Sequence, residues 1–227
     1  MEYCELKERA CAVNQAIGAV GLANLTWGNA SAYDPDAGVM AIKPSGVPYS
    51  QLTPDHMVLV SRDGEVIGGG LKPSSDSVTH LVLYRAFEHV HGIVHSHSTF
   101  ATAWAQACLA IPCLGTTHAD HFRGPVPVTR DLTDEEIASD YVGNTGLVVV
   151  EAAVDSEGVP AVLVARHAPF VWGHSIEEAL ENAIALEHVA EMALTTLSLN
   201  SAVSPMPSAL LARHFERKHG PAKTYGQ

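Results

Sequence analysis

The chain has 227 residues, of which 47% are hydrophobic, 17% charged and 6% aromatic. This composition excludes a disordered tail or a fibrous repeat, and is typical of a globular chain that buries about 70–75% of its unfolded surface. Thirteen Lys and Arg against 25 Asp and Glu give a formal charge of −12, which disfavours nucleic acid and anionic membranes as partners. A phosphorylated substrate would therefore need a local cluster of cations and backbone amides.

The apolar runs are short. The segments 147–150 and 159–165 fall far below the roughly 20 residues that cross a bilayer. The first residues carry acids instead of the basic and apolar segments of a secretory signal, so we expect a cytoplasmic protein. The cysteine spacing matches neither a zinc knuckle nor a dense disulfide framework, which predicts reduced thiols. These cysteines are Cys4, Cys11, Cys108 and Cys113.

The first half of the chain predicts a helix and then two hairpins. Apolar residues at a spacing of three or four predict an amphipathic helix over the first twenty residues, ending near Gly21. Two pairs of β-like runs then flank turn-forming residues, which is typical of hairpins. The paired runs are 27–33 with 39–43, and 57–61 with 65–68.

Helices and strands alternate in the rest of the chain. Helices are expected over 78–87, 99–109, 175–199 and 207–218, and strands over 92–97, 147–150 and 162–165. Thr133 is expected to cap a turn before the strand at 147–150, and Ser175 to open a capping box. Since no linker or internal repeat divides residues 1–227, we expect a single α/β domain with helices on the faces of a layered sheet.

Two histidines alternate along the strand predicted over 92–97. Residues i and i+2 of a strand point to one face, so His95 and His97 can bind one metal ion. An isolated pair of this kind is more often structural, and a third ligand decides between the two interpretations. His167, after the strand predicted at 162–165, is the best candidate. Three neutral imidazoles that leave one position open are typical of a catalytic metal site.

Two Lys-Pro-Ser segments combine a cation with hydroxyls and backbone amides. They are Lys43-Pro44-Ser45-Gly46 and Lys72-Pro73-Ser74-Ser75. If they converge, they form a cradle for a phosphate group; taken singly, each is more often an ordinary turn. The glycine-rich segments 18–21 and 68–70 lack the spacing of a dinucleotide fingerprint.

Two more polar positions are candidates. Asn29 lies beside Gly28 at a strand end, which suits a close approach to a ligand or, equally, a turn. Asp120 lies in a polar loop and is a candidate general acid or base, although loop aspartates are more often caps or solvated. Trp104 and Trp172 are assigned to the core.

Several motifs occur together in one order, from about residue 20 to the end. They are TWGNASA, IKPSGVPYSQLTPDHMVLVS, KPSSDSVTHLVLYRAF, GIVHSHSTFATAWAQ, GTTHADHF, HAPFVWG and ERKHGPAKTYGQ. With these motifs the chain resembles the L-ribulose-5-phosphate 4-epimerases of the class II aldolase/epimerase superfamily, whose near kin are the fuculose-phosphate-type aldolases. The resemblance implies a three-layer α/β fold with a central, mostly antiparallel sheet and helices on both faces.

The resemblance also implies roles for individual residues. His95, His97 and His167 would bind a divalent metal, with Zn²⁺ expected and Mn²⁺ or Co²⁺ as alternatives, and Asp76 would be a further ligand or a nearby acid. Asp120 and Tyr225 would be the acid/base pair, in a homotetramer whose active sites lie at subunit interfaces. The substrate-binding set would be Asn29, Lys43, Ser45, Gly46, Ser74, Ser75, Thr116, Thr117, His214 and Arg217.

The implied reaction interconverts L-ribulose 5-phosphate and D-xylulose 5-phosphate, by retro-aldol cleavage and re-addition at C4. It belongs to pentose catabolism, and arabinose, ascorbate and other pentose sources stay open as its supply. One alternative is an aldolase that releases its fragments; Asp76, where aldolases tend to have glutamate, and the Thr-Tyr-Gly-Gln terminus disfavour it. The other is a non-catalytic scaffold like the adducin head domains, which would have no reason to keep the metal histidines.

Two positions depart from the family pattern. Ala165 stands where members often have the first histidine of a His-x-His pair, and His121 where a tyrosine is common. Neither is among the expected metal ligands, so the metal site is expected to survive both changes.

Overall fold

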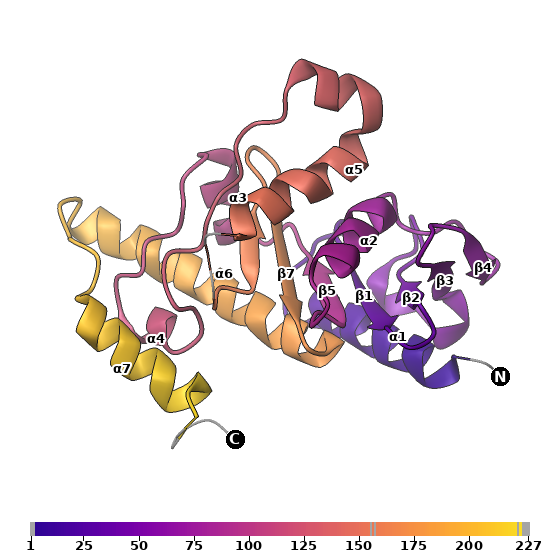
Figure 1. The fold of residues 1–227 in the computed structure, drawn as a ribbon, viewed down its shortest axis with the longest axis horizontal. Coiled ribbons are helices and arrows are strands. Elements are labelled where there is room, and N and C mark those ends of the chain that lie inside the picture. The colour runs from indigo at the N-terminus through magenta and orange to yellow at the C-terminus, as the bar shows by residue number, and fades with distance from the viewer. Residues whose placement is uncertain (1–2, 155, 157, 222, 224–227) are drawn as a thin grey trace.

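Seven strands form one antiparallel sheet in the order β4-β3-β2-β1-β5-β7-β6 (Figure 1). The computed structural model describes residues 3–154, 156, 158–221 and 223. The strands are β1 Asn29–Asp34, β2 Val39–Ile42, β3 Val58–Ser61, β4 Val66–Gly68, β5 Gly92–His95, β6 Ala161–Leu163 and β7 Pro169–Gly173. Both predicted hairpins, β1–β2 and β3–β4, are confirmed.

Helices cover both faces of this sheet. They are α1 Cys4–Ala19, α2 Ser77–Ala86, α3 Thr99–Gln106, α4 Thr116–Ala119, α5 Asp134–Ala153, α6 Ile176–Leu199 and α7 Ser208–His219, with two short 3₁₀ helices, η1 Tyr49–Gln51 and η2 Pro54–His56. Side chains alternate between the faces of a strand: Val39 and Ala41 of β2 join the core under α1, α3 and α6, whereas Met40 and Ile42 join the core under α2 and α5. The expected three-layer class II aldolase-like fold is confirmed.

The register of the central strands determines which residues meet at each end of the sheet. β5 pairs with β1 and β7, so His95 lies between Asn29 and Phe170 in one row. At the opposite end of the same strands, Gly92 pairs with Gly173. Because a strand rises about 3.3 Å per residue, these two ends are about 10 Å apart.

The strand predicted over 147–150 is wrong, because these residues belong to the long helix α5. Thr133 opens this helix with a full capping box: its side chain accepts from the Glu136 amide, and the Glu136 carboxylate accepts from the Thr133 amide. The valine run then packs on α2, where a Cβ built on Gly146 would lie 2.7 Å from Val82 Cβ. Helix capping and close helix–helix packing therefore outweigh the β-propensity of the valines.

Three smaller differences concern the chain near the functional site. β5 ends at His95, so His97 lies just beyond the strand. β7 was not predicted as a strand, although Trp172 within it is buried as expected. The box at Ser175 is half formed: the serine caps the Glu178 amide, but the Glu178 carboxylate accepts from the amide of His174 instead.

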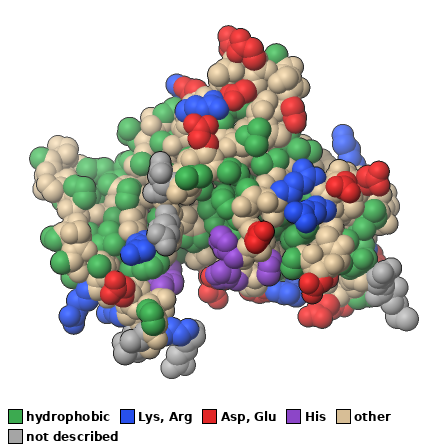
Figure 2. Space-filling view, in the orientation of Figure 1, with side chains coloured by type: hydrophobic (Ala, Val, Ile, Leu, Met, Phe, Trp, Pro, Cys, Tyr) green, Lys and Arg blue, Asp and Glu red, His purple; other side chains and the backbone are tan. Residues whose placement is uncertain are grey.

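The surface carries both signs of charge. Figure 2 shows basic and acidic side chains interspersed over one face, with hydrophobic side chains between them. Among the described residues, no helix combines the length and apolar character needed to span a membrane. The four cysteines are free thiols, as expected.

Gly92 allows α6 to approach β5 closely, and this contact is testable. A Cβ on Gly92 would lie 2.2 Å from Ile176 Cα, a backbone atom that cannot rotate away. We expect Gly92→Ala to lower the free energy of unfolding by about 2–3 kcal/mol, measured by urea denaturation, because overpacking forces backbone shifts. Gly70→Ala, at a position with open space, is the matched control and should change stability little. Equal stability of the two variants would contradict this interpretation.

Candidate metal centre and anion pocket

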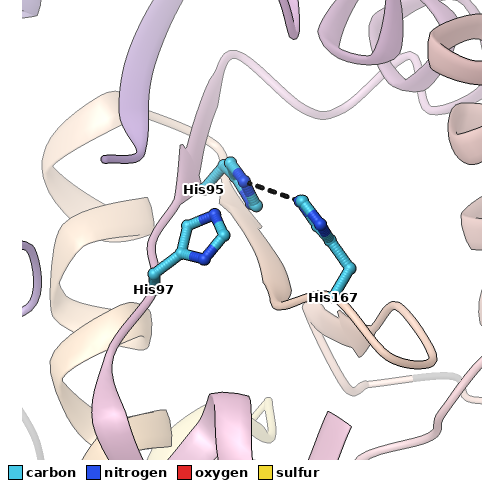
Figure 3. Close-up of side chains that lie close together, drawn as sticks. All are labelled: His95, His97 and His167. Carbon is cyan, nitrogen blue, oxygen red and sulfur yellow. Dashed lines mark hydrogen bonds between the residues drawn. The ribbon is translucent and has the colours of Figure 1, made fainter. Parts of the chain in front are cut away.

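Three histidines from two parts of the chain converge at one end of the sheet. His95 ends β5, His97 follows it, and His167 lies in the loop between β6 and β7 (Figure 3). One ring nitrogen of each lies within 4.8 Å of the others, and the ring centroids are 4.9–5.1 Å apart. Such a cluster can hold a single metal ion with one face left open.

Hydrogen bonding and burial prepare these imidazoles to act as ligands. Nδ1–H of His95 donates to the carbonyl of Pro169 at 2.9 Å, which leaves its Nε2 lone pair facing Nε2 of His167 at 3.3 Å. Burial lowers the pKa of His95 to about 3 and also lowers the pKa values of His97 and His167. The three rings are therefore neutral at pH 7, as metal ligation requires.

A tight turn presents His167. The amide of Val164 donates to the carbonyl of Ala168, and the amide of His167 donates back to Val164. Arg166 within this turn has a φ of 60°, an uncommon conformation for a residue other than glycine. Its amide donates to Ala105 of α3, so a neighbouring helix holds the strained residue in place.

Asp76 completes one side of the cluster. Its Oδ2 lies 4.0 Å from Nε2 of His95 and accepts a hydrogen bond from Nδ2 of Asn29 at 2.7 Å. Burial raises the pKa of Asp76, but His95, His80 and the Asn29 amide outweigh it and bring this pKa below its usual range. The carboxylate is thus ionised and oriented beside the histidines.

The two Lys-Pro-Ser segments lie side by side. Pro44 and Pro73 form an isolated β-bridge, and reciprocal backbone hydrogen bonds join Ser45 to Lys72 and Ser74 to Lys43. Gly46 has a φ of 73° and open space around its α-carbon, which exposes the backbone of the first segment. The expected convergence of the two segments is therefore confirmed.

Lys43 is the unusual member of this group. Its side chain is only 2% exposed, and burial lowers its pKa. Its Nζ has long contacts of 3.4 Å to the carbonyls of Thr26 and Pro44, and lies 4.9 Å from the centroid of the Tyr49 ring. No carboxylate in the described part of the chain forms an ion pair with it. A buried ammonium without an anionic partner fits an anion-binding role.

Gly28 joins the two halves of the site. Its φ is 77°, and an added Cβ would lie 2.6 Å from the carbonyl oxygen of His95. Only glycine fits this close approach between the loop before β1 and the end of β5. A cavity of about 340 Å³ lies here, lined by Thr26, Trp27, Gly28, Asn29, Lys43, Pro44, Ser45, Gly46, Ser74, Ser75, Asp76, His95, His97 and His167. Metal-ligand and anion-binding groups thus share one pocket.

The other predicted residues lie elsewhere in the chain. Thr116 and Thr117 are exposed at the start of α4, and Thr117 lines a separate cavity against α6. His219 of α7 donates to the carbonyl of Asp120 and lines a cavity of about 320 Å³ that includes Gly173. Asp120 is thus at the opposite end of the sheet from the histidines. Tyr225 lies outside the described residues.

Asp120 forms its own polar cluster with α7. It accepts from Nε and Nη2 of Arg217 and from Nδ1 of His214, at 2.9–3.2 Å. Burial raises the pKa of Asp120, but these hydrogen bonds outweigh it and bring the pKa below its usual range. The structure therefore brings Asp120, His214 and Arg217 together as predicted neighbours, with an ionised carboxylate among them.

Sequence reasoning missed a buried network behind the histidines. Tyr84 OH donates to the Ser31 carbonyl at 2.9 Å, so the 2.7 Å contact between Tyr84 and Ser31 Oγ uses the serine proton. Ser31 Oγ then accepts from His80 Nδ1 at 2.7 Å. The His80 ring meets the edge of Phe170, which stacks on His95 at 4.2 Å. The available signal was the strand alternation that puts Ser31 on the face of Asn29.

Fold and site together define the class of this protein. Residues 8–194 match the family described as Class II Aldolase and Adducin N-terminal domain, and the chain belongs to this family. The L-fuculose 1-phosphate aldolase structure aligns with a TM-score of 0.82 at 22% identity, over 94% of this chain and 95% of that one. The aldolase of that name from Thermus thermophilus has a TM-score of 0.71 at 25% identity, over 87% and 98%.

A curated relative is considerably more similar in sequence. L-ribulose-5-phosphate 4-epimerase UlaF from Salmonella paratyphi C (strain RKS4594) is 47% identical over 225 residues, which cover 98% of this chain and 99% of that one. This match confirms the resemblance to the 4-epimerases and the expectation of an enzyme of the epimerase class. It also disfavours the scaffold alternative.

Loss of one histidine should remove the metal. We expect His97→Asn to weaken Zn²⁺ affinity by more than about a hundredfold, since even the loss of a residue behind the ligands costs 10–100-fold. Turnover should disappear with the metal. The measurements are chelator competition and metal content per subunit, with His188→Asn, at an exposed position of α6, as control. Full activity of His97→Asn without bound metal would contradict the assignment.

Proposed function

We propose that this protein interconverts L-ribulose 5-phosphate and D-xylulose 5-phosphate by epimerisation at C4. The observation that carries this proposal is the pocket in which three neutral imidazoles face an unpartnered buried lysine. The 47% identity with a protein named for this activity supports the choice of reaction. We also propose that residues 1–227 work as one catalytic domain in pentose catabolism; the cytoplasmic location stays a prediction.

The chemistry explains why both halves of the pocket are needed. C4 of the substrate is not adjacent to the C2 carbonyl, so an anion formed by removing its proton has no stabilising group. Cleavage of the C3–C4 bond avoids this, because the bonding electrons pass toward the C2 oxygen while the C4 hydroxyl loses its proton and becomes an aldehyde. A divalent metal held by His95, His97 and His167, with Zn²⁺ proposed, would supply Lewis-acid stabilisation of the substrate oxygens.

The residues of the pocket then determine the stereochemistry. Lys43, Ser45, Gly46, Ser74 and Ser75 would hold the phosphate of the two-carbon aldehyde, with Asn29 beside them. The fixed phosphate lets the aldehyde turn its other face to the attacking carbon. Re-formation of the C3–C4 bond, with return of a proton to the C4 oxygen, gives the inverted centre. An aldolase differs in one step only, because it releases the aldehyde before recapture.

Asp120 and Tyr225 are the proposed acid/base pair, and they would act on the pocket of a neighbouring subunit. Asp120 lies at the opposite end of the sheet from its own histidines, so it cannot serve them within one chain. Its low pKa suits a proton acceptor at neutral pH. A homotetramer with sites at its interfaces, also lined by Thr116, Thr117, His214 and Arg217, supports this arrangement.

The reaction is tested on the metal-loaded protein. L-ribulose 5-phosphate is the substrate, and D-xylulose 5-phosphate and free dihydroxyacetone are followed together over time. We expect xylulose phosphate to accumulate with almost no dihydroxyacetone, because the phosphate anchors keep the aldehyde in place. Accumulation of dihydroxyacetone and glycolaldehyde phosphate would make the protein an aldolase, and no conversion of the ketopentose would overturn the proposal.

The shared site is tested by complementation. Asp120→Asn should lower kcat by about 10²–10⁴ with metal content unchanged, and His97→Asn should be inactive. When the two variants are co-expressed and mixed tetramers are purified, about a quarter of wild-type activity should return, because random assembly restores that share of interface sites. Co-expression of His95→Asn with His97→Asn, which damages one side only, is the control. No recovery in the first mixture would contradict a site built by two subunits.

A further inference from the structure

One aromatic side chain lines the pocket without a role in the mechanism above. Trp27 is 51% exposed, whereas Trp104 and Trp172 are 7% and 6% exposed and belong to the core. Its ring centroid lies 6.3 Å from that of His97, at an angle of 55°. A half-exposed indole in a loop gains little from packing, so its position beside a metal-ligand histidine calls for another explanation.

The backbone of Trp27 is held at both ends. Its amide donates to the carbonyl of Asn24 at 3.1 Å, and its carbonyl accepts from the Tyr49 hydroxyl at 2.7 Å. The ring of Tyr49 is also the one that lies under the Lys43 ammonium. One buried tyrosine therefore links the position of the proposed phosphate cation to the position of the indole.

The two ends of the pocket offer different kinds of contact. Around Lys43 the contacts are directional: an ammonium, hydroxyls and backbone amides. Trp27 offers a flat apolar face beside His97, the side where the carbons of a phosphate-anchored fragment would lie. Hydrogen bonds to an aldehyde would favour one of its two faces, whereas an aromatic surface contacts both faces without a preferred direction. Such a surface can confine the fragment and still let it turn.

We propose that Trp27 is a specificity-determining residue that covers the carbon end of the two-carbon aldehyde phosphate between bond cleavage and bond re-formation. It favours recapture over release and so separates epimerisation from aldol cleavage. This inference rests on the proposed function, because it concerns a fragment that only this reaction produces.

The first test compares the fate of the fragment in three variants. Trp27→Ala should raise the ratio of free dihydroxyacetone to xylulose 5-phosphate by about tenfold, with metal content and melting temperature unchanged. Trp27→Phe keeps an aromatic face and should stay within about twofold of the wild type. Leu25→Ala is the matched control, since Leu25 lies in the same loop, is 74% exposed and is outside the pocket lining. An unchanged ratio in Trp27→Ala would overturn the proposal.

A second test does not depend on turnover. Calorimetric titration of the metal-loaded protein should show that Trp27→Ala weakens binding of glycolaldehyde phosphate by about fivefold and leaves binding of inorganic phosphate unchanged. Equal affinities of the wild type and the variant for glycolaldehyde phosphate would overturn the role of Trp27, even in an active enzyme. A wild type that does not epimerise would instead overturn the proposed function, and this binding comparison would still decide the role of Trp27.

Discussion

The antiparallel pairing of β5 with β1 and β7 is the constraint on which the site depends. It places Asn29, His95 and Phe170 in one row at one end of the sheet. His95 gains a hydrogen bond from its Nδ1 to Pro169, a stacking partner in Phe170 and a carboxylate neighbour in Asp76 from this single register. A slip of one residue would turn the imidazole of His95 to the other face of the sheet.

Close backbone approaches hold this end of the sheet together. Gly28 brings the loop before β1 against the carbonyl of His95, and Gly92 brings α6 against the other end of β5. The strained Arg166, held by Ala105, then presents His167 from the far side. The histidines are rigid because three separate contacts between elements fix the chain that carries them, which limits the reorganisation needed when a metal binds.

The net charge of −12 and the anion pocket are compatible for a local reason. A cation on the surface would be screened and surrounded by acids, whereas Lys43 is buried and touches two carbonyls and an aromatic ring. In such surroundings an incoming phosphate meets little competition from water or carboxylates. The acidic surface and the basic pocket thus serve different distances.

The separation of Asp120 from the histidines makes the oligomer part of the chemistry we propose. Asp120 and its partners on α7 form a preorganised cluster at the opposite end of the sheet. A monomer would hold the metal and the phosphate site but would lack the proposed proton acceptor. Trp27, at the mouth of the pocket, would then face the residues that the neighbouring subunit contributes.

The sequence by itself determined the elements with strong local signals. The helix over the first twenty residues, both hairpins, the helix after Ser175 and the pairing of His95 with His97 follow from periodicity, turn residues and capping. These are interactions between residues close in the chain, so a linear pattern records them. The seven collinear motifs also pointed to the family that the comparisons confirm.

Only the tertiary structure decided what depends on distant contacts. The run at 147–150 is helical because α2 accepts it, His167 reaches His95 because β7 lies beside β5, and the two Lys-Pro-Ser segments meet because a bridge joins Pro44 to Pro73. The orphaned ammonium of Lys43, the network of Ser31 and His80, and the distance of Asp120 from its own histidines have the same origin. Each is a matter of burial and register between segments far apart in the chain, which local propensity does not encode.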